Sequence, residues 1–316
     1  MLTDILFILM GLAGLWIGAN TLVYGIKNFA RAAGMSELFI GLAFLSIGTT
    51  VPEISVSITG ALHGLFGVDA SGIVVGNAIG SAIANIALFI GILAALTPFA
   101  LARNGIRQHA ILLLASIILV FTLGIDGSLS RTDGILLLGA YAVYYFTIII
   151  GERATHDGTK PSHRKTFVDI AYAILGLCVV LLSSNIVIDQ AILLSAHLGI
   201  AQSLIGLLIV SIGTGLPELS VAIASVRQRA PAISIGDLIG SSISVLLLAL
   251  GAGSVINDFA VDQKLMIFDL PALLALAGLF FAFWYARQRL TRLEGFILIA
   301  LYLTYAFINV FVLRYI

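Results

Sequence analysis

The segment GLAFLSIGTTVPEISVSI (residues 41–58) returns in the second half of the chain as GLLIVSIGTGLPELSVAI (residues 206–223). Eleven of the eighteen positions are identical, and each copy places a glutamate, Glu53 or Glu218, directly after a proline. A carboxylate within a membrane is costly, and a proline there leaves a backbone carbonyl without its helical partner. Two such elements in one apolar chain predict a cation-binding site near the middle of a bilayer.

The composition predicts an all-α polytopic membrane protein. Of the 316 residues, 60% are hydrophobic and 10% are charged, whereas a soluble domain carries roughly 25% charged residues. Because a spanning helix needs about 20 apolar residues, we predict ten transmembrane helices. The predicted spans are residues 3–26, 36–62, 70–97, 106–125, 132–151, 166–188, 199–226, 231–255, 266–285 and 294–315.

The positive residues predict how these helices are oriented. With the N-terminus outside, thirteen Lys and Arg residues fall in inner loops, and only Arg131, Lys264 and Arg314 fall outside. Cytoplasmic loops are enriched in positive residues, and one missed or added span would invert every later loop. We therefore expect both termini on the extracytoplasmic side.

The predicted spans divide the chain into two five-helix repeats. Residues 1–151 form the first repeat, residues 152–165 a cytoplasmic linker, and residues 166–316 the second repeat. An odd number of helices per repeat makes the second copy enter the membrane from the opposite face, so we expect inverted topology. This topology would bring Glu53 and Glu218 together near mid-membrane.

The two Pro-Glu elements carry oxygen atoms of the kind that hard cations prefer. Glu53 is accompanied by the hydroxyls of Thr49 and Thr50, and Glu218 by that of Thr214. Na⁺ and Ca²⁺ prefer several oxygen ligands, including backbone carbonyls. The alternative for either copy alone is a proline kink beside a protonated glutamate. For two matched copies in inverted halves, we favour an ion site.

A second pair of related segments follows the first, with side chains spaced four residues apart on one helix face. These positions are Asn77, Ser81 and Asn85 in span 70–97, and Asp237, Ser241 and Val245 in span 231–255. Both segments also contain Gly-x₃-Gly, which favours the close approach of another helix. Helix packing alone is the alternative explanation for these glycines and serines.

The remaining acidic residues and histidines predict no second site. Most Asp residues fall at outer helix ends as caps or solvated charges, and Asp269 is expected close to the outer interface. The five histidines lack the spacing of metal ligands. No nucleotide-binding loop, nucleophile elbow or zinc motif is found, which argues against an enzyme and for transport driven by ion gradients.

The motifs quoted above resemble those of the sodium/calcium exchanger family, and particularly its compact prokaryotic members. The family's Gly-Thr-Ser-x-Pro-Glu appears as residues 48–53 and 213–218, and its Gly-Ser-x-x-x-Asn as residues 80–85. The resemblance implies that the central ligands for Ca²⁺ and competing Na⁺ are Glu53 and Glu218. It also implies further oxygen ligands, which are Thr49, Thr50, Ser81, Asn85, Thr214 and Ser241.

The resemblance further implies that spans 1 and 6 slide as a gate against the other eight. The second repeat departs from the family pattern at two positions. Gly215 replaces a serine, and Val245 stands where the family places an Asp or Asn opposite Asn85. Asp237 lies two turns earlier, about 12 Å along the helix axis, so it is expected to line the inner approach or cap the helix.

These features predict a secondary-active cation antiporter that exchanges Na⁺ for Ca²⁺ across a prokaryotic plasma (inner) membrane by alternating access. The alternative is a cation/proton antiporter on the same scaffold, such as an H⁺/Ca²⁺ exchanger, because glutamates in apolar surroundings can carry protons. A channel would instead show uncoupled flux. We expect a monomer in the lipid bilayer, with no cofactor beyond the transported ions and no nucleic-acid partner.

Overall fold

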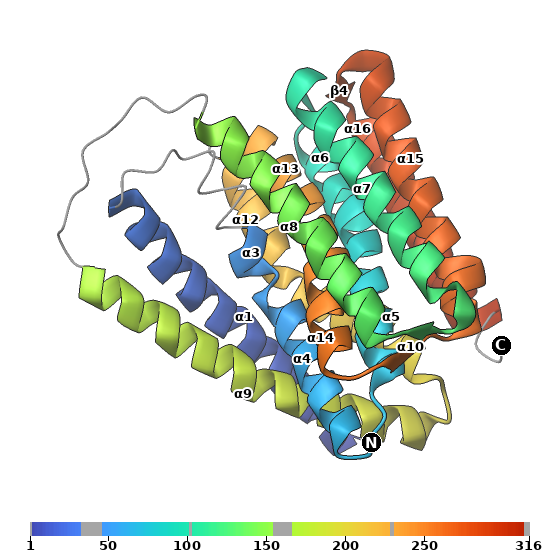
Figure 1. Cartoon of the computed structure of the whole chain (residues 1–316). Coiled ribbons are helices and arrows are strands. Elements are labelled where there is room, and N and C mark those ends of the chain that lie inside the picture. The colour runs from blue at the N-terminus through green and yellow to red at the C-terminus, as the bar shows by residue number, and fades with distance from the viewer. Residues whose placement is uncertain (1, 33–45, 101–102, 154–165, 228–230, 313–316) are drawn as a thin grey trace.

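The protein is described by a computed structural model whose described residues are 2–32, 46–100, 103–153, 166–227 and 231–312. Within these ranges the chain is almost entirely helical, and its four strands have two residues each. Figure 1 shows the long helices gathered into one bundle. The predicted all-α polytopic fold is confirmed.

The first half of the chain forms the helices and short strands that precede the central linker. They are α1 (Leu2–Ala32), α3 (Ser46–Thr49), α4 (Val51–Leu65), α5 (Ser71–Ile83), η2 (Ala84–Phe89), α6 (Ile90–Leu96), β1 (Phe99–Ala100), α7 (Arg103–Leu123), η3 (Gly124–Asp126), β2 (Ser128–Leu129) and α8 (Arg131–Arg153). Of these, η2 is a turn of π-helix and η3 a turn of 3₁₀-helix.

The second half repeats this order closely. Its elements are α9 (Thr166–Leu198), α10 (Gln202–Ile205), η4 (Gly206–Val210), α11 (Ser211–Thr214), α12 (Leu216–Arg227), α13 (Pro231–Ser244), η5 (Val245–Ala249), α14 (Leu250–Ile256), β3 (Phe259–Ala260), η6 (Leu265–Asp269), α15 (Leu270–Arg287), β4 (Arg289–Leu290), α16 (Arg292–Phe307) and η7 (Ile308–Val312). The elements η4, η5, η6 and η7 are all turns of π-helix.

Nine helical segments in the described part of the chain are long and apolar enough to cross a membrane. They match nine of the ten predicted spans. The remaining span, 36–62, begins with residues 36–45, which lie outside the described ranges, and continues as α3 and α4. The count of ten therefore stays a prediction.

Two contacts near the ends of helices support a tenth crossing. The Asp4 carboxylate contacts the His197 imidazole at 2.6 Å, so both residues lie at one end of the bundle. Five of the nine segments lie between them, and an odd number would place them at opposite ends. Gln202 Nε2 donates to the backbone oxygen of Asp69 at 3.2 Å, which puts Asp69 at that same end. The additional crossing must then lie before Asp69, where α3 and α4 run.

The two halves run through the bundle in opposite directions (Figure 1). Helices α1 and α9 lie side by side and antiparallel, and the same reversal relates α4 to α12 and α5 to α13. The strands join the halves at both ends of the bundle, because β1 pairs antiparallel with β4 and β2 with β3. This is the inverted topology that the sequence predicts. The predicted linker falls at residues 152–165, and residues 154–165 lie outside the described part of the chain.

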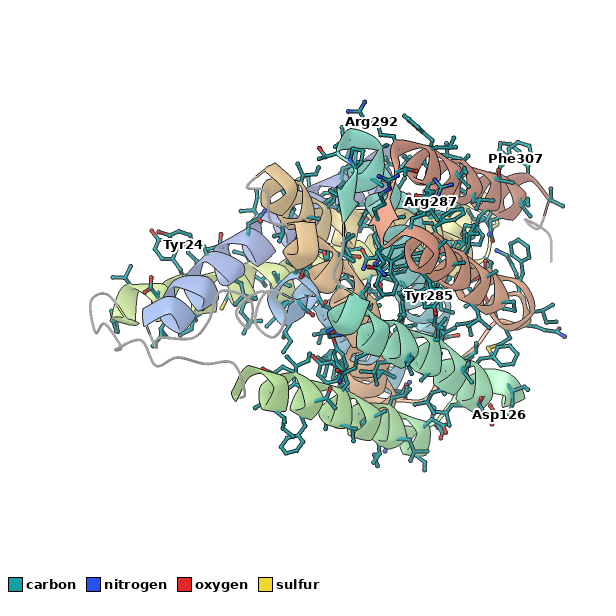
Figure 2. The ribbon with its side chains drawn as sticks, turned by 90° about the horizontal axis from the view of Figure 1, so that it is seen from above. Tyr24, Asp126, Tyr285, Arg287, Arg292 and Phe307 are labelled. Carbon is teal, nitrogen blue, oxygen red and sulfur yellow. The ribbon has the colours of Figure 1, made fainter. Side chains whose placement is uncertain are left out.

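The outside of the bundle is apolar, as a lipid-facing surface requires. Tyr24 and Phe307 point away from the helices (Figure 2), and each is 57% exposed. Many other large hydrophobic side chains on α1, α8, α9 and α16 are also exposed. The polar side chains of the two Pro-Glu elements and of the polar helix faces that follow them are instead buried between the helices.

Glycines let α1 and α9 pack with their backbones in contact. A Cβ atom added to Gly18 would lie 2.9 Å from the backbone nitrogen of Val180, and one on Gly176 would meet the backbone of Leu22. Small residues at a helix interface permit this approach. The pair predicted to slide as a gate is therefore held together along its length.

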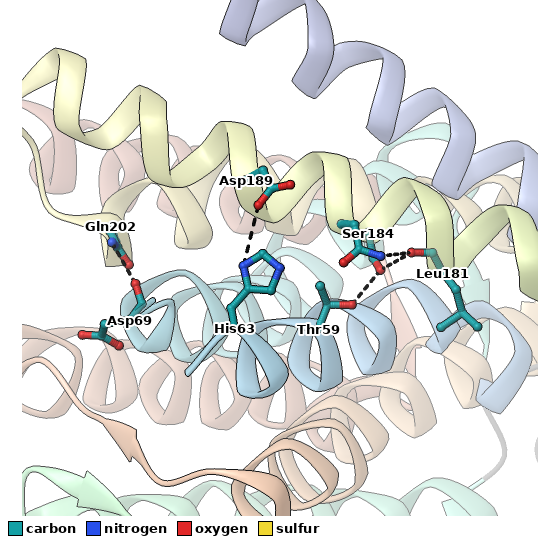
Figure 3. A network of polar contacts seen from close by, with 8 residues as sticks. Thr59, His63, Asp69, Leu181, Ser184, Asp189 and Gln202 are labelled. Carbon is teal, nitrogen blue, oxygen red and sulfur yellow. Dashed lines mark hydrogen bonds and ion pairs between the residues drawn. The ribbon is translucent and has the colours of Figure 1, made fainter. Parts of the chain in front are cut away.

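Polar contacts connect α9 to α4 near one end of the bundle (Figure 3). The Thr59 and Ser184 hydroxyls are 2.9 Å apart, and His63 Nδ1 lies 3.7 Å from Asp189 Oδ1. Ser184 lies just before residue 188, where the span was predicted to end, and Asp189 lies just after it. That boundary is wrong, because α9 continues to Leu198. The next residue, Gly199, has a φ of 62°, which favours glycine.

Replacing Gly176 with leucine tests the packing of α1 on α9. We expect the added side chain to destabilise the protein by about 1–3 kcal/mol, because the backbone of α1 leaves no room for it. The measurement is the thermal unfolding midpoint of the purified protein in detergent. Gly139→Leu is the matched control, since a Cβ atom there meets nothing within 4 Å. Equal effects of the two substitutions would contradict this packing.

Candidate functional site: two buried glutamates between the inverted halves

Both Pro-Glu elements have the same break in the helix. Helix α3 ends at Thr49 and α4 begins at Val51, whereas α11 ends at Thr214 and α12 begins at Leu216. The residue at each break has nearly the same backbone conformation, with φ and ψ of −77° and −3° at Thr50 and −80° and −1° at Gly215. The repeated sequence thus produces a repeated local structure.

The prolines in these breaks free backbone oxygens next to the glutamates. Pro52 and Pro217 have no N–H group, so they cannot donate to the carbonyls of Gly48 and Gly213, four residues earlier. Each freed carbonyl lies in a buried segment that also carries a glutamate. The arrangement supplies backbone oxygens that a cation can use as ligands.

Glu53 and Glu218 are both buried between helices, with 2% and 1% of their surface exposed. Each has one carboxylate oxygen, Oε2, with no hydrogen-bond partner among the described residues. The two carboxylates lie close enough to interact electrostatically. No ion pair joins either of them to a basic side chain in the described part of the chain. Burying two carboxylates without a compensating charge costs free energy, and binding a cation or a proton removes that cost.

Two pairs of hydroxyls cross between the halves and obey the inverted symmetry. Thr49 Oγ1 lies 3.3 Å from Ser241 Oγ, and Thr214 Oγ1 lies 3.5 Å from Ser81 Oγ. Ser81 also donates to Glu53 Oε1 at 3.4 Å. Thr49 and Thr214 therefore each meet the polar helix face of the opposite half, whereas the Ser81–Glu53 contact lies within the first half.

The same symmetry extends to two serines that sequence reasoning missed. The carbonyl oxygen of Ser46 accepts from Thr49 at 3.3 Å and from Ser241 at 3.5 Å. The carbonyl oxygen of Ser211 accepts in the same way from Thr214 at 3.3 Å and from Ser81 at 3.4 Å. Their position three residues before the site threonines, in both copies of the repeat, is the signal that could have identified them.

Thr50 and Asn77 are held by hydrogen bonds of different kinds. The Thr50 hydroxyl donates to the Ser46 carbonyl at 2.7 Å, so its oxygen keeps free lone pairs. Thr214 Oγ1 lies 3.1 Å from Asn77 Oδ1, which brings Asn77 to the edge of the site. Asn77 was recognised in the sequence as part of the polar stripe but was not predicted as a site residue.

Asn85 and Val245 occupy equivalent places in the two halves, at turns of π-helix. Asn85 is the second residue of η2 and Val245 the first residue of η5, and both are buried. Asn85 Oδ1 has no hydrogen-bond partner among the described residues. Val245 offers only methyl groups there, so the site has one amide oxygen and no counterpart to it.

Gly215 is explained by an aromatic side chain from the first half. A Cβ atom added to Gly215 would lie 2.8 Å from Cε2 of Phe89, which is buried in η2. Thr50, the counterpart of Gly215, carries a full side chain, and Ala249, the counterpart of Phe89, is small. The missing hydroxyl and the large aromatic ring are therefore a complementary pair.

Asp237 lies fully buried in α13, with 0% of its surface exposed. Neither of its carboxylate oxygens has a hydrogen-bond partner in the described chain, and it lies one helical turn before Ser241 on α13. No three His, Cys, Asp or Glu side chains among the described residues converge as a metal-binding group. Asp237 is therefore near the site but does not form a three-carboxylate cluster with the glutamates.

A membrane bundle of inverted halves with buried carboxylates between them is the architecture of a secondary cation transporter. Comparison with known proteins agrees. The family model described as sodium/calcium exchanger protein matches residues 3–150 and 168–311. The inner membrane protein YrbG of Escherichia coli (strain K12) is 30% identical, over 89% of this chain and 88% of its own. The sodium/calcium exchanger MaX1 of Methanosarcina acetivorans is 26% identical, over 96% and 97%.

A solved structure has the same fold. It is the sodium-calcium exchanger NCX_Mj soaked with 10 mM Na⁺ and zero Ca²⁺, with a TM-score of 0.69, 27% identity and 98% of each chain covered. The chain belongs to the sodium/calcium exchanger protein family. It is a cation/calcium antiporter of a membrane and not an enzyme.

The pairing of Gly215 with Phe89 predicts a coupled pair of substitutions. We expect Gly215→Ser to destabilise the protein by about 1–3 kcal/mol, because the new side chain would overlap the ring. The smaller ring-free side chain of Phe89→Leu should recover at least about 0.5 kcal/mol of that loss in the double variant. Thermal unfolding midpoints of the four proteins measure the coupling. Strictly additive effects would show that the two side chains do not compete for space.

Proposed function

We propose that the protein exchanges Na⁺ for Ca²⁺, with Glu53 and Glu218 as the central ligands. The observation that carries this proposal is the pair of buried carboxylates, each with an unpartnered oxygen, between hydroxyl pairs contributed by both halves. Thr49, Thr50, Ser81, Asn85, Thr214 and Ser241 would complete the oxygen environment. Carboxylate, hydroxyl, amide and carbonyl oxygens suit both ions.

The charge of the glutamates supplies the coupling in this proposal. A bound Ca²⁺ or bound Na⁺ ions neutralise the carboxylates, and helices α1 and α9 can then slide across the loaded site. An empty site keeps two negative charges, and covering them with apolar helices costs several kcal/mol. The empty carrier therefore does not return, and transport becomes obligatory exchange.

We further propose that the protein acts as a monomer in a prokaryotic plasma (inner) membrane, with both termini extracytoplasmic. The asymmetry of thirteen inner against three outer positive residues supports this orientation. The name of the relative YrbG, an inner membrane protein, supports the location.

A cation/proton antiporter is the second candidate function. Val245 and Gly215 each remove an oxygen from the second half, which leaves fewer ligands for several Na⁺ ions. The buried Asp237 adds a carboxylate that has no hydrogen-bond partner among the described residues. A site with more carboxylates and fewer neutral oxygens suits proton binding better than a site with the same oxygen ligands in both halves would.

Calcium uptake into proteoliposomes distinguishes the two candidates. We expect an outward Na⁺ gradient at fixed pH to drive ⁴⁵Ca²⁺ uptake, because Na⁺ and Ca²⁺ compete for the same carboxylates. A pH gradient without Na⁺ should drive little uptake. The reverse result would reject Na⁺ coupling and support H⁺ coupling. Uptake without any counter-ion gradient would indicate a channel.

Removing the charge of either glutamate tests the site. We expect Glu53→Gln and Glu218→Gln each to reduce exchange to the background of empty vesicles, because the cation loses a carboxylate at its centre. The proteins should still fold, since the amide is isosteric and relieves charge burial. Asp126→Asn, at an exposed turn between α7 and α8, is the control and should exchange normally. Retained exchange in the glutamate variants would contradict the site assignment.

A further inference from the structure

A second buried polar cluster lies between η6 and the end of α16, in segments that carry neither glutamate. Asp269, the last residue of η6, is fully buried, and its Oδ1 accepts from the Tyr305 hydroxyl at 2.6 Å. Asn309 Nδ2 donates to the same oxygen at 3.2 Å. The expectation that Asp269 lies close to the outer interface stays a prediction, and its carboxylate is enclosed between the helices.

Two oxygens of this cluster have no hydrogen-bond partner among the residues that the structure describes. They are Asp269 Oδ2 and Asn309 Oδ1, and both residues are 0% exposed. The Asn309 amide turns its donor nitrogen toward Asp269, which is the orientation that suits an ionised carboxylate. Asp269 Oδ2 and Asn309 Oδ1 are therefore both available to a cation, which accepts lone pairs from oxygen atoms.

The backbone around the cluster is also irregular. Asp269 closes one π-helical turn and Asn309 is the second residue of another. A π-helical turn changes the hydrogen-bond register from four residues to five, and such turns occur often at functional sites. The cluster therefore lies where the α-helical hydrogen-bond register is interrupted in both segments.

No basic side chain neutralises Asp269 directly. Lys264 lies one residue before η6, and no ion pair joins it to Asp269 in the described part of the chain. A buried carboxylate with no paired charge is unstable unless a cation or proton is bound. One carboxylate carries a single negative charge, so a monovalent cation balances it, whereas Ca²⁺ would leave a buried positive charge.

We propose that Asp269 and Asn309 form a second cation site, separate from the transport site, that binds a monovalent cation such as Na⁺. Asp269 Oδ2 and Asn309 Oδ1 are its side-chain ligands, and Tyr305 fixes the carboxylate by its hydrogen bond to Oδ1. The ring of Tyr305 is itself held by stacking on Phe268, with centroids 5.9 Å apart. A bound ion would hold η7, which continues α16, against η6.

The experiment measures stabilisation by Na⁺ in a protein whose transport site is disabled. In the Glu53→Gln/Glu218→Gln double variant, NaCl should raise the thermal unfolding midpoint relative to choline chloride at equal ionic strength. Adding Asp269→Asn should raise the half-saturating Na⁺ concentration at least about tenfold. Asn309→Leu should weaken the response in the same direction while keeping the carboxylate. The exposed Asp262→Asn is the matched control and should leave the response unchanged.

Two results of this experiment would overturn the proposal. One is that the double glutamate variant shows no response to Na⁺, and the other is that Asp269→Asn and Asn309→Leu leave the response intact. Stabilisation that follows pH but not Na⁺ would mean that Asp269 holds a proton only. If Asp269→Asn does not fold, crystals of the otherwise unchanged protein soaked in Tl⁺ give the answer. The proposal requires anomalous density beside Asp269 Oδ2, and its absence at saturating Tl⁺ rejects it.

Discussion

The energetic cost of burying two carboxylates is the constraint on which the rest of this structure depends. Glu53 and Glu218 have almost no contact with solvent and no basic partner among the described residues. A chain tolerates this only if surrounding oxygens and a bound ion compensate the charge. The broken helices, the crossing hydroxyl pairs and the freed carbonyls all serve that compensation. The proposed sliding of α1 and α9 depends on the same cost, since in that proposal these helices cover the site only when it is neutral.

The two halves surround the buried carboxylates with the same backbone conformation and different side chains. The helix breaks at Thr50 and Gly215 agree within a few degrees, and the hydroxyl pairs agree within a few tenths of an ångström. The differences are confined to what lines the site. Phe89 fills the space that a hydroxyl at residue 215 would need, and Val245 offers no oxygen where the first half has Asn85. A symmetric scaffold therefore carries an asymmetric set of polar side chains.

The sequence predicts the parts of the fold and site that depend on local pattern and repetition. Hydropathy identifies the spans, loop charges give the inverted order, and the repeated Pro-Glu element identifies both glutamates. Packing between the halves could not be predicted in this way. Nothing near Gly215 in the sequence points to Phe89, which lies more than a hundred residues away. Asp269 and Asn309 were missed because π-helical turns break the α-helical spacing on which face assignments depend. The length of α9 was underestimated because Asp189 was read as a helix end, although it lies inside the helix and contacts His63.

The π-helical turns at Asn85 and Val245 also carry information about the history of the chain. Each such turn shifts the hydrogen-bond register by one residue relative to the α-helix on either side. Both halves have this shift at nearly the same point of the helix that follows the Pro-Glu element. The simplest origin is an ancestral five-helix protein that already had it before the gene was duplicated and fused. With this origin, the difference between Asn85 and Val245 arose after the duplication.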